Sequence, residues 1–340
     1  MRAMVLKEFG GPLRLEEVPR PSIGPRDVLL RVRACAADQF DVTIRAGKWP
    51  SAKIPLILGH EVSGEVAEVG ADVKHLRRGD RVCSTLYLTC GECRYCRIGR
   101  ETLCLNFGGH LGAEVDGGYA EYLRVPAANL VPISKAISFE EGSILANALG
   151  TPYHAIKERA RVQPGHVVVV VGAGGGVGLH AVQIAGLFGA RVIAADITPQ
   201  KREKAKALGA EVALDPREVP LDEKVLELTG GEGADAVIQL VGGDTFGPSL
   251  RSLRPGGRLV IIGSHTGFEV PLSALLVLGK ELEILGSRNV TKTELAEVVR
   301  LVEAGRLKPI VTETYPLEDL ERALDRVAKS AVVGRAVVRI

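Results

Sequence analysis

Residues 167–178 read VVVVVGAGGGVG, an unbroken apolar run followed by five glycines within seven residues. Successive β-branched residues predict a strand buried on both faces, as in parallel sheets. Beyond the glycines, apolar residues recur at helical spacing at Val177, Ala181 and Ile184, which predicts a helix that packs back on the strand. A strand, a glycine-rich turn and a helix N-terminus together form an anion site, and the expected ligand is a pyrophosphate.

An acid follows this turn at the distance that a dinucleotide site requires. Asp196 lies eighteen residues after Gly178, at the end of the next predicted strand, RVIAAD. A carboxylate at this place binds the ribose hydroxyls of NAD, while Lys201 and Arg202 nearby leave NADP open. A glycine-rich turn with an unrelated acid beyond it is the alternative, which the joint pattern disfavours. The contacts expected from the turn itself come from Gly174, Gly175, Gly176, Val177 and Gly178.

Strand and helix patterns alternate from residue 151 to 286. Six strands are expected near 167–171, 191–195, 211–214, 235–240, 258–262 and 282–285. Strands with helical crossovers predict an α/β fold with a Rossmann doubly wound parallel sheet. Because such sheets bind ligands at the carboxyl ends of their strands, the loop IIGSHTG is expected to contact the cofactor through Gly263, Ser264 and His265.

The flanking regions have another character. Residues 1–150 contain short alternating runs separated by Gly, Pro and Asp turns, a pattern typical of a small β-barrel or sandwich. Residues 287–340 contain two helical patterns and end in the strand-like AVVGRAVVRI. This tail resembles the first region more than the second, so we expect it to rejoin the N-terminal domain.

Composition narrows the classes of partner. The net charge is +2 with acids and bases interspersed, and 46% of the residues are hydrophobic. No stretch indicates nucleic-acid binding, and no apolar run reaches membrane-spanning length. The N-terminus lacks a signal-peptide core, so a cytoplasmic protein is expected.

Four of the six cysteines, Cys90, Cys93, Cys96 and Cys104, form a C-x2-C-x2-C-x7-C motif. Four thiolates complete a tetrahedral zinc shell and leave no open position, so the site would be structural. The surrounding residues are polar and rich in turns, and a metal would supply order that packing does not. Free thiols or disulfides are the alternative, which the spacing makes improbable.

A second cluster consists of Cys35, Asp38 and, further on, His60 and Glu61. A catalytic zinc takes three protein ligands and one open position. Cys35 and His60 are candidate ligands, and Asp38 or Glu61 could supply an oxygen or orient the imidazole. Taken singly, Cys35 could be a buried apolar thiol, and a lone histidine is more often a satisfied core residue.

The stretch 59–82, GHEVSGEVAEVGADVKHLRRGDRV, resembles the zinc-site region of the medium-chain dehydrogenase/reductase superfamily, which includes the zinc-containing alcohol dehydrogenases. The four cysteines, the glycine turn and Asp196 also fall at this family's positions. The resemblance spans essentially the whole chain. It implies a GroES-like catalytic domain at 1–150, rejoined by 287–340, and a Rossmann coenzyme domain at 151–286. It further implies a homodimer or homotetramer, paired through strands near 282–285.

The resemblance also assigns roles within the second cluster. Cys35 and His60 match ligands of the catalytic zinc, Glu61 matches an acid that approaches the metal, and Asp38 matches the acid that steadies the histidine. Thr151 matches a position beside the nicotinamide. The third-ligand position holds Asn147, and an amide is a poor zinc ligand beside thiolate, imidazole or carboxylate. The catalytic zinc is therefore expected to be weak, held with Asp38 or Glu61, or missing.

The resemblance implies NAD(P)-dependent hydride transfer between an alcohol and a ketone, with zinc as Lewis acid on the substrate oxygen. Ala37 and Phe40 replace the family's proton relay, and Phe40, Trp49 and Phe107 would suit a bulky apolar substrate. Ala173 at the first glycine position is a trait of the zinc-independent quinone reductases. A zinc-independent quinone or enone reductase is thus one alternative, and a coenzyme-binding protein without catalysis is another.

Overall fold

The computed structural model describes residues 1–264, 266–267 and 269–340, and the chain divides into two compact units. The first unit comprises Met1–Gly150 and Asn289–Ile340, and the second comprises Thr151–Arg288. In the described chain, no helix combines the length and apolar character needed to cross a membrane.

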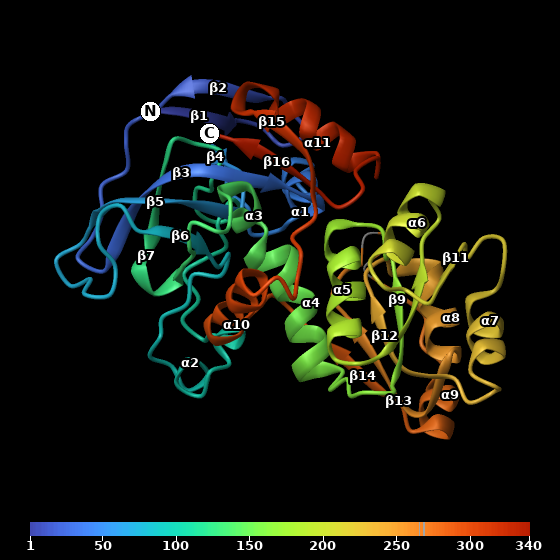
Figure 1. The fold of residues 1–340 in the computed structure, drawn as a ribbon. Helices are drawn as coiled ribbons and strands as arrows, with labels where there is room; N and C mark the ends of the chain where they lie inside the picture. Colours follow the sequence, from blue (N-terminus) through green and yellow to red (C-terminus); the bar gives the residue numbers. More distant parts are fainter. Residues whose placement is uncertain (265, 268) are drawn as a thin grey trace. The chain divides into compact units, whose positions relative to one another are not determined.

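The second unit is built on a six-stranded sheet in which every neighbouring pair is parallel. Its strands run in the order β11-β10-β9-β12-β13-β14 (Figure 1). Their bounds are β9 Val167–Val171, β10 Arg191–Ala195, β11 Val212–Leu214, β12 Ala234–Gln239, β13 Leu253–Ile261 and β14 Glu283–Gly286. The order reverses beside β9, which confirms the expected doubly wound Rossmann sheet.

Helices connect these strands. They are α5 Gly176–Leu187, α6 Pro199–Ala207, α7 Leu221–Leu228, α8 Phe246–Arg251 and α9 Ala274–Lys280, while α4 Gly150–His154 precedes β9 at the unit boundary. All five residues of β9 are buried. Val167, Val169 and Val171 share a core with residues of α7 and α8, whereas Val168 and Val170 point to the opposite face. The valine run is therefore covered on both faces, as its composition predicts.

The turn between β9 and α5 is fixed to the neighbouring strand. The N–H groups of Gly172 and Ala173 both donate to the carbonyl of Ala195, at 2.9 and 3.1 Å. Gly172 has φ +85°, a left-handed conformation that glycine adopts at little cost. A Cβ on Gly178 would lie only 2.2 Å from the Gly172 carbonyl oxygen. The turn therefore requires glycine at both ends.

The first unit contains a seven-stranded and a three-stranded sheet. The larger sheet runs β15-β16-β3-β5-β6-β8, with β7 paired to β3, and the smaller runs β2-β1-β4. The larger comprises β3 Asp27–Ala37, β5 Glu61–Val69, β6 Arg81–Ser84, β7 Tyr122–Pro126, β8 Leu130–Pro132, β15 Val311–Pro316 and β16 Arg335–Arg339. The smaller comprises β1 Arg2–Leu6, β2 Leu13–Glu17 and β4 Leu56–Ile57. These sheets form the β-rich, GroES-like part of the expected fold class.

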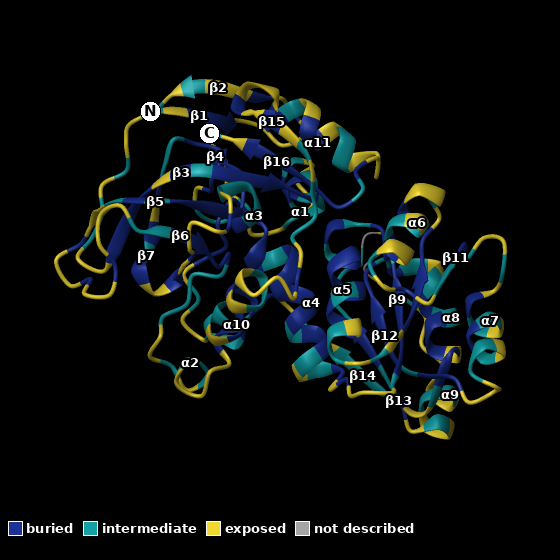
Figure 2. Ribbon diagram, in the orientation of Figure 1, coloured by how far each residue is buried: buried dark blue, intermediate teal, exposed yellow. Residues whose placement is uncertain are grey.

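The C-terminal strand completes the larger sheet. β16 pairs antiparallel with β3, placing Val338 opposite Cys35. The helices of this unit are α1 Gln39–Arg45, α2 Arg94–Arg97, α3 Phe139–Ser143, α10 Lys292–Glu303 and α11 Leu320–Ala328. Figure 2 shows β3, β5 and β16 largely in the buried colour. The side chains where β3 ends and where β5 and β16 begin are buried.

Two glycines of α5 provide a matched test of the turn. We expect Gly178→Ala to lower the free energy of unfolding by about 1–3 kcal/mol, because the new methyl group collides with backbone atoms of Gly172 and Ala173. Gly186→Ala is the control, since no atom lies within 4 Å of its added Cβ. There the change is expected to stabilise α5 by about 0.5–1 kcal/mol. Urea denaturation measures both, and equal effects would contradict this account of the turn.

Candidate functional site

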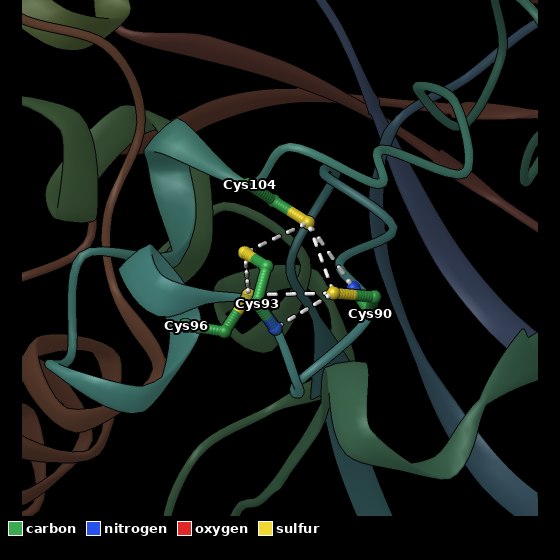
Figure 3. A group of neighbouring side chains, drawn as sticks. All are labelled: Cys90, Cys93, Cys96 and Cys104. Carbon is green, nitrogen blue, oxygen red and sulfur yellow. Dashed lines mark hydrogen bonds between the residues drawn. The ribbon is translucent and has the colours of Figure 1, made fainter.

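The four-cysteine cluster is assembled by two short helical segments and the turns around them (Figure 3). Cys96 lies within α2, while Cys104 directly follows a 3-10 turn, Glu101–Leu103. The recorded sulfur–sulfur distances are 3.5 Å for Cys93–Cys96 and Cys90–Cys104, 3.9 Å for Cys90–Cys96 and 4.0 Å for Cys93–Cys104. A tetrahedral ion with Zn–S bonds of about 2.3 Å requires an edge of about 3.8 Å. The cluster therefore fits a structural zinc.

Backbone donors around Cys90 and Cys93 favour their thiolates, whereas burial raises the pKa of Cys96 and Cys104. The N–H groups of Glu92 and Cys93 donate to the sulfur of Cys90, and that of Leu105 donates to the sulfur of Cys93. Hydrogen bonds from Leu105 and neighbouring backbone groups lower the pKa of Cys93 to about 6. A metal bound here would order the lobe from Cys90 to Cys104.

The second cluster lies where β3 ends and β5 begins. Asp38 follows β3 and caps α1, accepting from the N–H of Phe40 at 2.7 Å. His60 and Glu61 stand at the start of β5, and both are buried. Asn147 reaches the same place from a π-helical turn, Leu145–Leu149. Such turns interrupt regular helices and are frequent at functional sites.

Two aspartates contact different nitrogens of His60. Asp41 Oδ1 lies 3.4 Å from Nδ1, and Asp38 Oδ2 lies 3.5 Å from Nε2. Asp41 also accepts from the Tyr119 hydroxyl at 2.9 Å and from the N–H groups of Asp38 and Gly59. Asp41 is thereby held on one side of the imidazole and fixes its orientation. Asp38, expected either to orient this ring or to supply an oxygen ligand, lies on the Nε2 side among the candidate ligands.

The Nε2 side of His60 is filled by an amide and a guanidinium. The Asn147 side-chain nitrogen lies 3.2 Å from His60 Nε2, 3.1 Å from Asp38 Oδ2 and 2.8 Å from Glu61 Oε1. Arg335, on β16, donates to Asp38 Oδ2 at 3.2 Å and to Glu61 Oε1 at 2.7 Å. The two carboxylates are therefore bridged by two hydrogen-bond donors.

Burial and ion pairing have opposite effects on the pKa values of these groups. Burial opposes ionisation of Asp38, but the charges of His60 and Arg335 outweigh it and hold the Asp38 pKa well below its usual value. Burial also opposes protonation of His60, yet Asp38 and Asp41 raise the His60 pKa well above its usual value. Burial raises the pKa of Glu61 to about 6, although Arg335 lowers it. The cluster is thus a network of paired buried charges.

Cys35 does not join this network. Among the described residues, the side chains whose ligand atoms lie within 4.8 Å of one another are Asp38, Asp41 and His60, without Cys35. The Cys35 side chain belongs to the hydrophobic core, and its sulfur lies 3.1 Å from where a Cβ of Gly118 would stand. Burial raises the Cys35 pKa well above its usual value. Because Asp38 and Asp41 address opposite ring nitrogens and the third-ligand position holds the amide of Asn147 beside Nε2, the donor set does not fit the expected catalytic zinc.

Aromatic rings extend from this cluster. Phe40 stands edge-on to His60 at 5.2 Å and to Trp49 at 5.0 Å between ring centroids. His110 packs against Trp49, Tyr87 and Phe107. Its Nδ1 lies 2.6 Å from Glu114, which also accepts from Trp49 Nε1 at 2.9 Å. Phe40, Trp49 and Phe107 thus belong to one aromatic cluster.

The residues expected to bind the coenzyme lie in the second unit. The Asp196 carboxylate accepts from the N–H of Gly174 at 2.9 Å and from that of Thr198 at 3.1 Å. Lys201, in α6, packs so closely on Gly174 that a Cβ there would lie 2.1 Å from its own. Gly175 caps α5, whose first residues are Gly176, Val177 and Gly178.

Three further expected positions lie elsewhere in this unit, and one falls outside the description. Thr151 is buried in α4, and Gly263 and Ser264 follow β13. His265 lies outside the described residues.

Sequence analysis overlooked Asp41, Tyr119 and Arg335. Asp41 stands three residues after Asp38, and the two form a capping box that the D-x-x-D spacing signals. Arg335 is a charged residue inside the apolar run AVVGRAVV, which indicates a buried ion pair. No local signal distinguishes Tyr119 from an ordinary core tyrosine.

Two family models and several known proteins match the chain. Residues 24–135 match the alcohol dehydrogenase GroES-like domain, and residues 176–304 match the zinc-binding dehydrogenase model. An alcohol dehydrogenase from Geobacillus stearothermophilus is 38% identical, and an acryloyl-coenzyme A reductase from Sulfurisphaera tokodaii is 33% identical. Both alignments cover 100% of each chain. A crystal structure of an NAD-dependent alcohol dehydrogenase has a TM-score of 0.95 at 37% identity, also with 100% coverage of each chain.

Trp49 is the single tryptophan, so its fluorescence reports on the aromatic cluster. Burial raises the pKa of Glu114, but hydrogen bonds from Ser51, Trp49 and His110 outweigh it and lower that pKa to about 2. The stabilisation by ionised Glu114 is therefore present above its unfolded-state pKa near 4.5 and lost as the pH falls towards 2. We expect the Trp49 emission maximum to stay constant between pH 7 and 4, with circular dichroism monitoring the fold. Glu114→Ala should shift it to longer wavelength at pH 7, and a wild-type shift centred near pH 4.5 would contradict the pairing.

Proposed function

The chain belongs to the medium-chain dehydrogenase/reductase superfamily, among the zinc-containing alcohol dehydrogenases, and from this premise we propose that it transfers hydride reversibly between an alcohol or ketone and NAD. It is an enzyme of the alcohol dehydrogenase type. The observation that carries the proposal is the glycine turn between β9 and α5, with Asp196 bonded to it, in a chain that aligns with alcohol dehydrogenases over its whole length.

The second unit supplies the expected coenzyme contacts. The N-terminus of α5 offers backbone N–H groups and a favourable dipole to a pyrophosphate. Asp196 is oriented by the N–H groups of Gly174 and Thr198, which supports binding of the ribose hydroxyls. Its negative charge disfavours the 2′-phosphate of NADP, and Arg202 is already engaged with Asp215 at 2.8 Å. These contacts favour NAD over NADP.

The first unit supplies hydrogen-bond donors. In the cluster around His60, Arg335 and Asn147 present N–H groups beside two carboxylates. A substrate oxygen that displaces one of these carboxylate contacts would meet a donor fixed in a buried site, which stabilises the negative charge that develops during hydride transfer. The zinc of the four-cysteine lobe stabilises the local fold and takes no part in the reaction, because four thiolates leave no position for substrate.

A specific observation favours a second candidate, the reduction of a carbon–carbon double bond conjugated to a carbonyl. Asn147 and Arg335 occupy the side of His60 where a catalytic metal would bind. Hydride addition to the β-carbon of such a bond gives an enolate, whose oxygen a hydrogen-bond donor stabilises and whose α-carbon then takes a proton from solvent. Relatives named acryloyl-coenzyme A reductase align over essentially the whole chain at 33% identity. A cytoplasmic setting belongs to both proposals, because none of the six cysteines forms a disulfide, as is usual in reducing compartments.

A self-association surface is also part of the proposal. β14 is an edge strand of the six-stranded sheet, and nearby Leu272, Leu275 and Leu278 have exposed fractions of 53%, 78% and 76%. Proteins normally cover an apolar edge of this kind. A second copy related by a two-fold axis would pair β14 with itself and cover the leucines, which supports a homodimer.

Deuterium transfer tests the activity. We expect protein supplied with NADH deuterated at C4 to reduce ketones, with the label on the carbinol carbon, as mass spectrometry would detect. Label on the β-carbon of an enoyl thioester would select the second candidate. Turnover of neither substrate class would refute both.

The coenzyme assignment has its own control in this assay. Asp196→Asn removes one charge-assisted hydrogen bond, worth about 1.5–3 kcal/mol, so kcat/KM with NADH should fall at least about tenfold. The value with NADPH should fall less or rise. Asp222→Asn, at an exposed ion pair with Arg251, should change neither.

Light scattering after gel filtration tests the proposed dimer. We expect wild-type protein at twice the chain mass or more, and Leu275→Glu/Leu278→Glu at half the wild-type mass because two charges enter the apolar contact. Ile98→Glu, at an exposed position of the first unit, is the control and should leave the mass unchanged. A monomeric wild type would overturn the proposal.

A further inference from the structure

The side-chain amide of Asn147 stands at the centre of the second cluster. Its nitrogen is within 3.2 Å of one imidazole nitrogen and two carboxylate oxygens, from His60, Asp38 and Glu61. The imidazole nitrogen and the carboxylate oxygens are the atoms that a catalytic metal at this place would bind. A cation among them would face the two hydrogens of the amide, which point at the carboxylate oxygens of Asp38 and Glu61.

A permanent cation is also present. Arg335 is buried, and one of its terminal nitrogens lies 2.7 Å from Glu61 and 3.2 Å from Asp38. A guanidinium stays protonated, so it offsets carboxylate charge in the interior at every accessible pH. A divalent ion beside it would add like charge in a region of low dielectric, where repulsion is strong.

The thiol of Cys35, the soft ligand, lies at the border of the cluster and is packed into the core. Cys35 lies on β3 between Val62 of β5 and Val338 of β16. Its sulfur approaches Gly59 so closely that a Cβ there would lie 2.6 Å away. The thiol is thus packed against backbone in the core, while the imidazole and the carboxylates are shared with Asn147 and Arg335.

We propose that Arg335 and Asn147 together replace the catalytic zinc, so that the chain binds one zinc ion, in the four-cysteine cluster, and none at His60. Arg335 supplies the positive charge, and Asn147 supplies the directional contacts that a metal would make. The inference rests on the proposed function only for the identity of this cluster as the reaction centre. It follows that the polar groups of the reaction centre are protein side chains, without a metal ion.

Zinc stoichiometry tests the proposal without an activity assay. The full chain is expressed with added zinc, dialysed into metal-free buffer and analysed by mass spectrometry of the elements. We expect one zinc per chain in the wild type and in His60→Ala, and none in Cys93→Ser. His110→Ala, a buried histidine outside the cluster, is the matched control for His60→Ala. Two zinc ions in the wild type, with one lost in His60→Ala, would overturn the proposal.

A gain of metal tests the residues themselves. Asn147→Cys/Arg335→Leu removes both donors and adds a thiolate, so we expect a second zinc, abolished by adding His60→Ala. Cobalt substitution reports the same site, because a new Cys–His centre adds absorption bands to those of the four-cysteine centre. Failure of the folded double variant to bind a second ion would show that other features exclude it and overturn the assignment. A wild type that holds one zinc ion per chain and converts no substrate would refute the proposed function alone. A wild type that holds two zinc ions per chain and converts substrate would refute this inference alone.

Discussion

The buried guanidinium of Arg335 joins segments of the first unit that are far apart in the sequence. Its partners are Asp38, at the end of β3, and Glu61, at the start of β5, while Arg335 itself lies on β16. Asp38, Asp41 and Glu61 meet in a region that water scarcely reaches. Gathering three carboxylates there is tolerable only with opposing charge and well-placed donors. Arg335, His60, Asn147 and Tyr119 meet this requirement, and the positions of the surrounding strands depend on it.

The first unit neutralises its two charge-dense clusters by different means. Around His60, side-chain donors contact the carboxylates, and the protein itself completes the arrangement. Around the four cysteines, the hydrogen bonds come from backbone N–H groups, which favour thiolates without supplying a full positive charge. The sulfur spacing then leaves room for an ion. Both clusters contain residue types that bind metals. Their contacts distinguish the four-cysteine cluster, which has room for an ion, from the His60 cluster, in which side chains take the place of the ion.

Local patterns predict the second unit well because its strands and turns are specified by neighbouring residues. The valine run, the glycine turn and the helix that begins at Pro199 all stand where the sequence indicates them. The four-cysteine motif is equally local. The His60 cluster is not, because Arg335 lies 274 residues beyond Glu61. Spacing also cannot tell that the thiol of Cys35 packs in the core, since neighbouring strands decide what surrounds it. The coenzyme residues remain predictions, and His265 lies outside the described structure.

The pairing of β16 with β3 has a consequence for biosynthesis. Thr151–Arg288 is a continuous stretch of chain, so it has everything needed to fold while translation continues. The unit around it is discontinuous, and β3 must wait on the ribosome for more than half of the polypeptide to be made before β16 arrives. Until then, Asp38 and Glu61 lack their arginine, and the stretch of β3 from Ala34 to Ala37 lacks one of its strand partners. Molecular chaperones should therefore bind nascent chains that are stalled before residue 335.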